Sequence, residues 1–205
     1  MSTWENPNFI KPHGYDTVKK MNSFYIDDLI KYINSIDKLE EYKIVDFGCG
    51  NGRITLDLKE KLDKPFKYIG IDCCKEIIEI AKKNNKDENI SFFHMNIDEV
   101  DEVFLEKYKN FIFLFESTLC MVKDPARILK ILSNISDNIV LTRLWLSKNN
   151  IFYNKPHKWD GFNELSYNWR FTYDYLHTNT SMKIINGIRV DQTDDAIMQN
   201  VYLKK

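Results

Sequence analysis

The sequence has little cysteine, and this scarcity excludes two kinds of protein. Only 4 cysteines occur among 205 residues, and they form neither a CxxC pair nor a zinc-binding spacing. Cys73 and Cys74 are adjacent, which is poor geometry for a disulfide. We therefore predict no metal site and no disulfide framework, and we expect free thiols in a reducing compartment at Cys49, Cys73, Cys74 and Cys120.

Net charge is also nearly absent, and so are long apolar runs. Lys and Arg total 29 against 30 for Asp and Glu, which leaves a formal charge of -1. A protein that lives on nucleic acid or acidic lipid carries a basic surface instead. No window could span a bilayer, and residues 1–7 lack the basic and apolar regions of a secretion signal. We expect a cytoplasmic protein that binds neither membrane nor nucleic acid stably, and the sequence indicates no oligomeric state.

Repeats, low-complexity tracts and Gly/Pro/Ser-rich linkers are missing as well. With 205 residues, of which 43% are hydrophobic, the chain suits one domain with one core. We expect that domain to consist of a helical cap (1–39), an α/β core (40–145), an aromatic-rich insertion (146–182) and a terminal hairpin (183–205).

Hydrophobic spacing predicts strands and helices in alternation. Short apolar runs predict strands at 43–47, 68–72, 90–95, 111–115 and 139–142. Helical spacing predicts helices at about 15–38, 52–62, 75–85 and 125–134. Near-continuous apolar strands separated by helices are typical of an α/β fold with a parallel sheet covered on both faces. Two later runs, 183–190 and 196–204, have no helix between them and predict an antiparallel hairpin.

A glycine-rich run follows the first of these strands. It reads Asp46-Phe47-Gly48-Cys49-Gly50-Asn51-Gly52-Arg53, and the next helix begins directly after it. Glycine lets a backbone approach a ligand without a Cβ in the way and permits a positive φ. The helix N-terminus behind the loop favours an anionic group such as a carboxylate. Asp72 lies 22 residues beyond Gly50, at the end of the next strand, where a carboxylate can accept both hydroxyls of a ribose.

The glycine spacing distinguishes two cofactor classes. A dinucleotide fingerprint that starts at Gly48 needs its third glycine where Arg53 stands, so that pattern fails. The order acid-x-Gly-x-Gly-x-Gly resembles motif I of the class I S-adenosylmethionine-dependent methyltransferases, and Asp72 resembles their motif II acid. This resemblance implies a Rossmann-like fold with a seven-stranded, mainly parallel sheet and an antiparallel C-terminal strand. It also implies S-adenosyl-L-methionine as cofactor, held by Asp46, Gly48, Gly50, Gly52, Asp72 and the neighbouring Cys73.

The resemblance extends to three more segments of the site. Asn96 and Ile97 follow the third strand, where the family frames adenine, and Asp98 is an alternative to the amide. Tyr15 corresponds to a residue that closes over the methionine end of the cofactor. Glu116 follows the fourth strand and is expected to touch cofactor or substrate. The run after it, Ser117-Thr118-Leu119, lacks the Asn/Asp-Pro-Pro-Tyr/Phe motif of the enzymes that methylate amino groups on bases or glutamine.

The reaction itself requires alignment and, for a hydroxyl acceptor, a base. The candidate catalytic residues are His13, Glu116 and His157, with Asp160 as a further possibility. We expect methylation of a small molecule or a saccharide intermediate, at oxygen rather than nitrogen. Two alternatives remain open, a methyltransferase that acts on protein or RNA and a non-catalytic scaffold that kept the fold.

Overall fold

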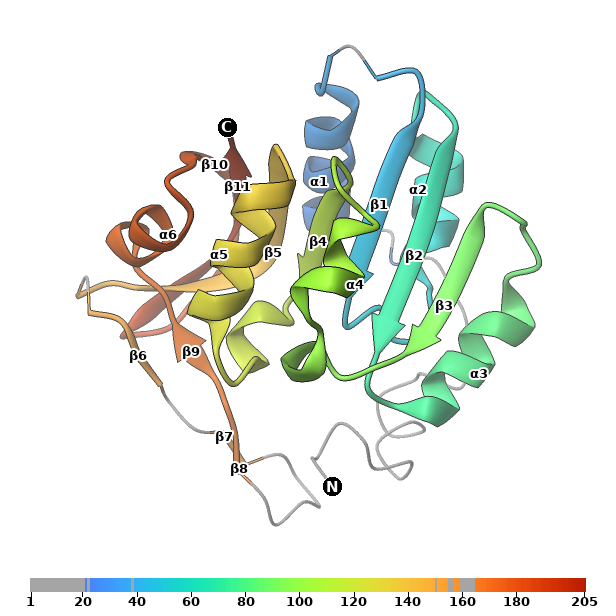
Figure 1. Cartoon of the computed structure of the whole chain (residues 1–205). Coiled ribbons are helices and arrows are strands. Elements are labelled where there is room, and N and C mark those ends of the chain that lie inside the picture. The colour runs from blue at the N-terminus through green and yellow to red at the C-terminus, as the bar shows by residue number, and fades with distance from the viewer. Residues whose placement is uncertain (1–20, 22, 38, 150, 155–156, 159–164) are drawn as a thin grey trace.

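A computed structural model describes residues 21, 23–37, 39–149, 151–154, 157–158 and 165–205, with the backbone alone for 157–158 and 165–166. Its centre is a seven-stranded sheet of order β10-β11-β5-β4-β1-β2-β3 (Figure 1). Five of these strands run parallel: β1 Tyr42–Phe47, β2 Phe66–Asp72, β3 Ile90–His94, β4 Ile112–Glu116 and β5 Asn138–Ser147. The last two, β10 Lys183–Gln192 and β11 Ala196–Lys204, form an antiparallel hairpin whose second strand lies between β10 and β5. The predicted fold class and hairpin are confirmed.

Helices cover both faces of the sheet because neighbouring strand residues point to opposite sides. Ile44 belongs to one apolar core and Val45 to the other. The first core is closed by α1 Phe24–Asn34, α2 Ile54–Lys61 and α3 Lys75–Asn84. The second is closed by α4 Glu102–Glu106, α5 Pro125–Ile135 and α6 Tyr173–Thr180. Two short 3₁₀ turns, η3 Ile97–Glu99 and η4 Leu119–Met121, follow β3 and β4.

The part of the chain after β5 is more regular than its sequence indicates. It forms two short strand pairs, β6 Tyr153–Asn154 with β9 Trp169–Arg170 and β7 His157–Lys158 with β8 Leu165–Ser166. The helix α6 follows, and its N-terminus is capped by Thr172, whose side chain accepts a hydrogen bond from the Tyr175 N–H. This helix buries only Leu176 and Thr180, so it has almost no apolar stripe from which to predict it.

Helix α5 begins as its sequence predicts. Pro125 occupies the first turn, and the Asp124 carboxylate accepts a hydrogen bond from the Arg127 N–H at 3.1 Å. The helix packs Ile128, Leu129 and Leu132 into the second core. Its start lies just beyond η4, so the cap also fixes where the chain turns after the end of β4.

Helix α1 is fastened to the C-terminal hairpin, although the two are far apart in the sequence. The Asp28 carboxylate accepts hydrogen bonds from the Ile188 N–H at 3.1 Å, the Asn200 side-chain amide at 3.0 Å and the Tyr202 hydroxyl at 2.5 Å. Tyr32 stacks on Tyr202 with ring centroids 4.0 Å apart. The first described helix and the last strand therefore form one packed unit.

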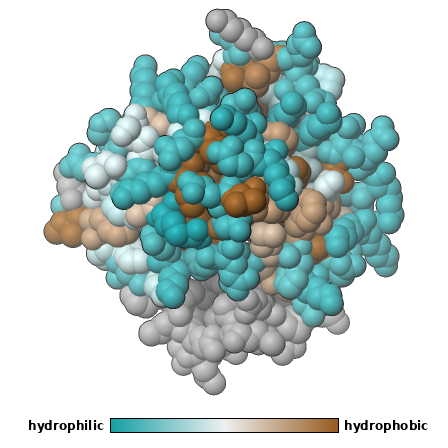
Figure 2. Space-filling model, in the orientation of Figure 1, coloured by the Kyte–Doolittle hydropathy of each residue, from teal (hydrophilic) through white to brown (hydrophobic). Residues whose placement is uncertain are grey.

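The surface over α4 and α5 is mostly hydrophilic, with a few separate apolar side chains (Figure 2). Of the helices that the structure describes, none is both long and apolar enough to cross a bilayer.

Candidate functional site

The glycine loop joins β1 to α2 and has a backbone that only glycine adopts readily. Gly48, Gly50 and Gly52 have φ values of 75°, 55° and 73°, all in the left-handed region. The N–H groups of Gly48 and Cys49 both donate to the Ile71 carbonyl of β2, at 2.8 and 3.1 Å. The loop is therefore held against the neighbouring strand in a fixed shape.

Space as well as conformation requires glycine at the start of this loop. A Cβ on Gly48 would lie 2.2 Å from Oγ1 of Thr118. The Thr118 hydroxyl in turn donates to the Glu116 carbonyl at 3.0 Å. The loop after β1 and the turn after β4 are thus in direct contact at the carboxyl edge of the sheet.

Asp72 ends β2 and connects two elements through its carboxylate. One oxygen accepts a hydrogen bond from the Gly50 N–H and the other from the Cys74 N–H, each at 2.9 Å. Burial raises the pKa of this carboxyl, and the two backbone donors act in the opposite direction. Each carboxylate oxygen has a second lone pair, so Asp72 can hold the loop and still accept ligand hydroxyls.

Asp46 lies near the end of β1 and is 1% exposed. Its Oδ2 accepts a hydrogen bond from the Tyr68 hydroxyl at 2.5 Å, whereas its buried Oδ1 has no partner among the described residues. Burial raises the pKa of this carboxyl to about 7, the Tyr68 bond lowers it, and the nearby Glu116 and Asp72 raise it further. A buried carboxylate oxygen without a partner is unfavourable, and a cationic ligand group would relieve it.

The turn after β3 presents Asn96 and Ile97, as predicted. The Asn96 side-chain oxygen accepts a hydrogen bond from the Asp98 N–H at 3.0 Å, which caps η3. Asp98 is occupied too, since its carboxylate accepts from the Lys123 N–H at 2.9 Å. Ile97 packs half-buried against the second core. Cys73, between Asp72 and α3, is half-buried, and its carbonyl lies 3.0 Å from His94 Nε2.

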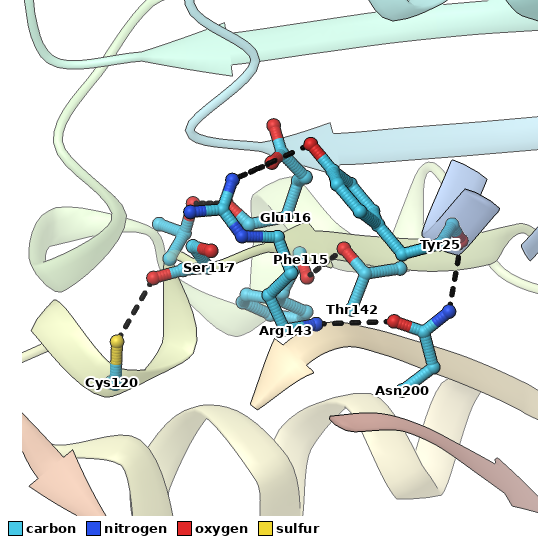
Figure 3. A network of polar contacts seen from close by, with 9 residues as sticks. Tyr25, Phe115, Glu116, Ser117, Cys120, Thr142, Arg143 and Asn200 are labelled. Atoms are coloured by element: carbon cyan, nitrogen blue, oxygen red, sulfur yellow. Dashed lines mark hydrogen bonds and ion pairs between the residues drawn. The ribbon is translucent and has the colours of Figure 1, made fainter. Parts of the chain in front are cut away.

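Glu116 and Arg143 form an ion pair at the point where the pairing of β4 with β5 ends. Arg143 Nη1 lies 2.9 Å from Glu116 Oε1 and 3.5 Å from the Tyr25 hydroxyl of α1. The guanidinium also stacks over the Tyr25 ring, 5.3 Å from its centroid. Figure 3 shows the arginine side chain reaching between the two partners. Glu116 is 17% and Arg143 32% exposed at the side chain, so the pair is only partly solvated.

The backbone beside this pair is strained in two places. Ser117 and Arg143 have φ values of 59° and 53°, although neither is glycine. They lie next to each other, because the Ser117 N–H donates to the Thr142 carbonyl at 3.0 Å. The Asn200 side chain accepts a hydrogen bond from the Arg143 N–H at 3.2 Å, and the β5–β11 register shifts there (Figure 3). The resulting bulge turns Arg143 toward α1.

The predicted roles of His13 and His157 stay predictions, because the structure describes the side chain of neither. His13 and Tyr15 lie outside the described residues, as does Asp160. The backbone of His157 forms β7 with Lys158, and its side chain is not described. Of the predicted catalytic residues, the structure therefore places only Glu116 at the carboxyl edge of the sheet beside the loop and Asp46.

Sequence reasoning missed Tyr25 and Arg143. The signal for Arg143 was present, because it is a lone charge inside the apolar run from Ile139 to Leu146. Tyr25 had no such signal, since an aromatic residue on an amphipathic helix is normally expected in the core.

Together, these residues offer a ligand a buried carboxylate oxygen without a partner among the described residues, a loop with three glycines and a second carboxylate at the end of the adjacent strand. The described residues thus fit two parts of S-adenosylmethionine, the cationic amino group and the ribose with its two hydroxyls.

Comparison with known proteins agrees with this geometry. Residues 38–155 match the family model described as a methyltransferase domain. A release factor glutamine methyltransferase from Buchnera aphidicola is 45% identical over 74 residues, which are 34% of this chain and 26% of that protein. The chain therefore spans about a quarter of that curated relative. Among solved structures, the N-terminal domain of EvdMO1 with S-adenosylhomocysteine bound has a TM-score of 0.66 at 13% identity, and covers 100% of this chain and 99% of its own. The sugar N-methyltransferase KedS8 from Streptoalloteichus also has a TM-score of 0.66, at 9% identity, over 100% of this chain and 95% of its own.

Proposed function

Because the chain belongs to the methyltransferase domain family, within the class I S-adenosylmethionine-dependent methyltransferases, we propose that it methylates a small-molecule or saccharide biosynthetic intermediate, at oxygen rather than nitrogen. The observation that carries the cofactor assignment is the buried, unpartnered Oδ1 of Asp46 beside three left-handed glycines. A scaffold that had lost its ligand would have no reason to keep this unsatisfied group.

When bound, S-adenosylmethionine supplies an activated methyl group on a positively charged sulfur. Asp46 then pairs as a carboxylate with the amino group of the methionine end, and Asp72 accepts the ribose hydroxyls. Asn96 and Ile97 border the adenine, with the Asn96 oxygen using its second lone pair. Cys73 lines the ribose side. The family resemblance also assigns Tyr15, which lies outside the described residues, to the methionine end of the cofactor.

The acceptor lies on the side of Glu116 in this proposal. The Glu116 carboxylate would take the proton of the acceptor hydroxyl as the methyl–oxygen bond forms and the methyl–sulfur bond breaks, and Arg143 holds that carboxylate in one orientation at 2.9 Å. Two histidines, His13 and His157, are the further candidates for this proton transfer. Two features favour methylation at oxygen. Glu116 can act as a base, and Ser117-Thr118-Leu119 lacks the Asn/Asp-Pro-Pro-Tyr/Phe motif of enzymes that methylate amino groups. Saccharides are favoured by the likeness to a sugar N-methyltransferase.

A protein acceptor is the second candidate, because one relative is named a release factor glutamine methyltransferase. That name belongs to the relative, and the residues after Glu116 differ here from the motif for glutamine. A screen of saccharides and peptides with methyl-labelled S-adenosylmethionine separates the two. Label that appears only in peptide would overturn the small-molecule proposal. We also propose that the protein works in the cytoplasm, since its four cysteines are free thiols.

Titration calorimetry with S-adenosylhomocysteine tests the site directly. Asp72→Ala removes the ribose acceptor and also releases Gly50, so affinity should fall at least about ten-fold, equivalent to about 1.4 kcal/mol. Asp194→Ala, at an exposed position of the terminal hairpin, is the matched control and should bind as the wild type does. Equal affinity of a folded Asp72→Ala variant would exclude the proposed role.

A further inference from the structure

Arg170 is a buried cation outside the cofactor loop. It is 5% exposed, and no described carboxylate forms an ion pair with it. Its Nη1 donates to the Asn168 side-chain oxygen at 2.7 Å, and its guanidinium stacks on Trp145, 4.6 Å from the ring centroid. The Nε–H is buried and has no hydrogen-bond partner among the residues that the structure describes. A desolvated arginine without an anion is unfavourable, so something must compensate for it.

The neighbouring tyrosine balances this charge only indirectly. Tyr153 is the cross-strand partner of Arg170, and its hydroxyl interacts with the guanidinium. The same hydroxyl donates to the Asp195 carboxylate at 2.7 Å. Asp195 is therefore one hydroxyl away from the cation, and the Arg170 Nε–H has no direct partner among the described residues.

The fold places Arg170 beside the acceptor side of the site. One edge of β5 pairs with β11 and the other with β4, which ends at Glu116. Beyond that point the second edge is free of β4, and there Leu146 pairs in parallel with Phe171. The Trp169 indole N–H donates to the Val122 carbonyl at 2.8 Å, just after η4. Phe171 points into the second core, so Arg170 points to the opposite side of its strand.

The charge of Arg170 also acts on Cys120, in the turn that follows β4. Burial raises the pKa of the Cys120 thiol to about 12, and the positive charges of Arg170 and Arg143 both act to lower it. Both guanidiniums therefore lie near the turn that follows Glu116. Arg143 already has its carboxylate in Glu116, whereas Arg170 has none among the described residues.

We propose that Arg170 binds an oxyanion carried by the acceptor, so that the methylated intermediate is acidic and bears a carboxylate or phosphate group. Arginine binds such groups through paired N–H donors. The stack on Trp145 and the hydrogen bond to Asn168 hold the guanidinium group in one orientation. This inference rests on the proposed methyltransferase function, because it assigns the acceptor of that site.

The test uses inorganic phosphate as the probe, with S-adenosylhomocysteine at saturation so that the carboxylate of the cofactor does not compete. Phosphate should raise the melting temperature of the wild type above that in chloride of equal ionic strength. Arg170→Met should abolish this rise and weaken phosphate binding at least about ten-fold. Arg170→Lys keeps the positive charge without the paired N–H donors and should retain part of the rise in melting temperature caused by phosphate. Arg189→Met, at an exposed arginine of β10, should behave as the wild type.

Stability without phosphate separates binding from a structural role. If Arg170 is kept for a ligand, Arg170→Met replaces an uncompensated buried charge by an apolar chain and should melt no lower than the wild type. A clear fall in the melting temperature of both Arg170→Met and Arg170→Lys would overturn the proposal, as would a wild type that phosphate does not stabilise. S-adenosylhomocysteine should stabilise every variant, and its failure to stabilise the wild type would instead refute the proposed function.

Discussion

At the scale of single residues, the least ordinary group is the Asp46 carboxyl. It is buried next to Tyr68, Glu116 and Asp72, and among the described residues only the tyrosine donates a hydrogen bond to it. Its pKa of about 7 lies above the ordinary value of 3.8, so the folded protein binds this proton more tightly than the unfolded chain. The group therefore stabilises the fold at low pH, and that contribution is lost as the pH rises through about 7.

We predict opposite pH dependences for stability and for cofactor binding. Between about pH 5 and about pH 8 the ligand-free melting temperature should fall, because the carboxyl ionises without a partner. Over the same range the rise in melting temperature caused by S-adenosylhomocysteine should grow, because the ionised form pairs with the amino group. Thermal melting with and without ligand measures both. Asp46→Asn should flatten both curves, and a variant that keeps the wild-type slopes would assign them to another group.

The predictable residues of the site are those fixed by local spacing. Asp46, the glycines and Asp72 are recognisable because one loop and one strand end place them. Tyr25, Arg143 and Arg170 come from α1, β5 and β9, and Tyr25 meets Arg143 only after the sheet has formed. No spacing rule joins positions so far apart, and the bulge that turns Arg143 toward α1 depends on Asn200, near the other end of the chain.

At the scale of elements, the glycine loop is where conformation and binding are most closely linked. Gly50 has φ 55° and donates its N–H to Asp72 at 2.9 Å. Gly50→Ala should destabilise the fold by about 1 kcal/mol, because alanine is strained at this φ. We also expect it to reduce the stabilisation by S-adenosylhomocysteine strongly, since the shape of the loop forms the site. A folded variant stabilised as much as the wild type would show that the loop tolerates a Cβ.

The N-terminal cap of α5 is expected to affect the stability of the fold and not cofactor binding. Asp124→Ala removes the acceptor for the Arg127 N–H and should lower the free energy of unfolding by about 1 kcal/mol. Asp124→Asn keeps a capping oxygen and serves as the control. Urea unfolding monitored by circular dichroism gives both values. Equal stability of the alanine and asparagine variants would mean that Pro125 alone defines the start of the helix.

The bounds of strands and helices were predicted well where apolar residues recur at regular spacing, and poorly where they do not. The strands β1 to β4 and the helices α2, α3 and α5 end within a few residues of their expected bounds. Strand β5 runs on to Ser147 because Leu144 and Leu146 return to the second core after the bulge at Arg143. A bulge reverses the alternation of inward and outward residues, and this reversal hides the second half of the strand from a period-two pattern.

At the scale of the whole molecule, Asp28 joins the first described helix to the terminal hairpin. Asp28→Ala removes the carboxylate that accepts from the Tyr202 hydroxyl and one of the acceptors of the buried Asn200 amide, which also donates to the Tyr25 carbonyl at 2.9 Å, and should destabilise the protein by about 2 kcal/mol. Asp27→Ala, one position away on an exposed face, removes only a surface ion pair with Lys61 and is the matched control. Chemical unfolding of the two variants compares them. Similar losses would show that α1 is held by its apolar face alone.

The position of β11 has a consequence for biosynthesis. The ribosome delivers β10 before β11, yet β11 is the strand that joins β10 to β5. Until β11 emerges, β10 has no described strand to pair with, and the long edge of β5 stays open while the rest of the sheet can already form. Open strand edges recruit other chains. A nascent chain stalled before Ala196 should therefore depend on chaperones, whereas one that has passed Lys204 can close its own sheet.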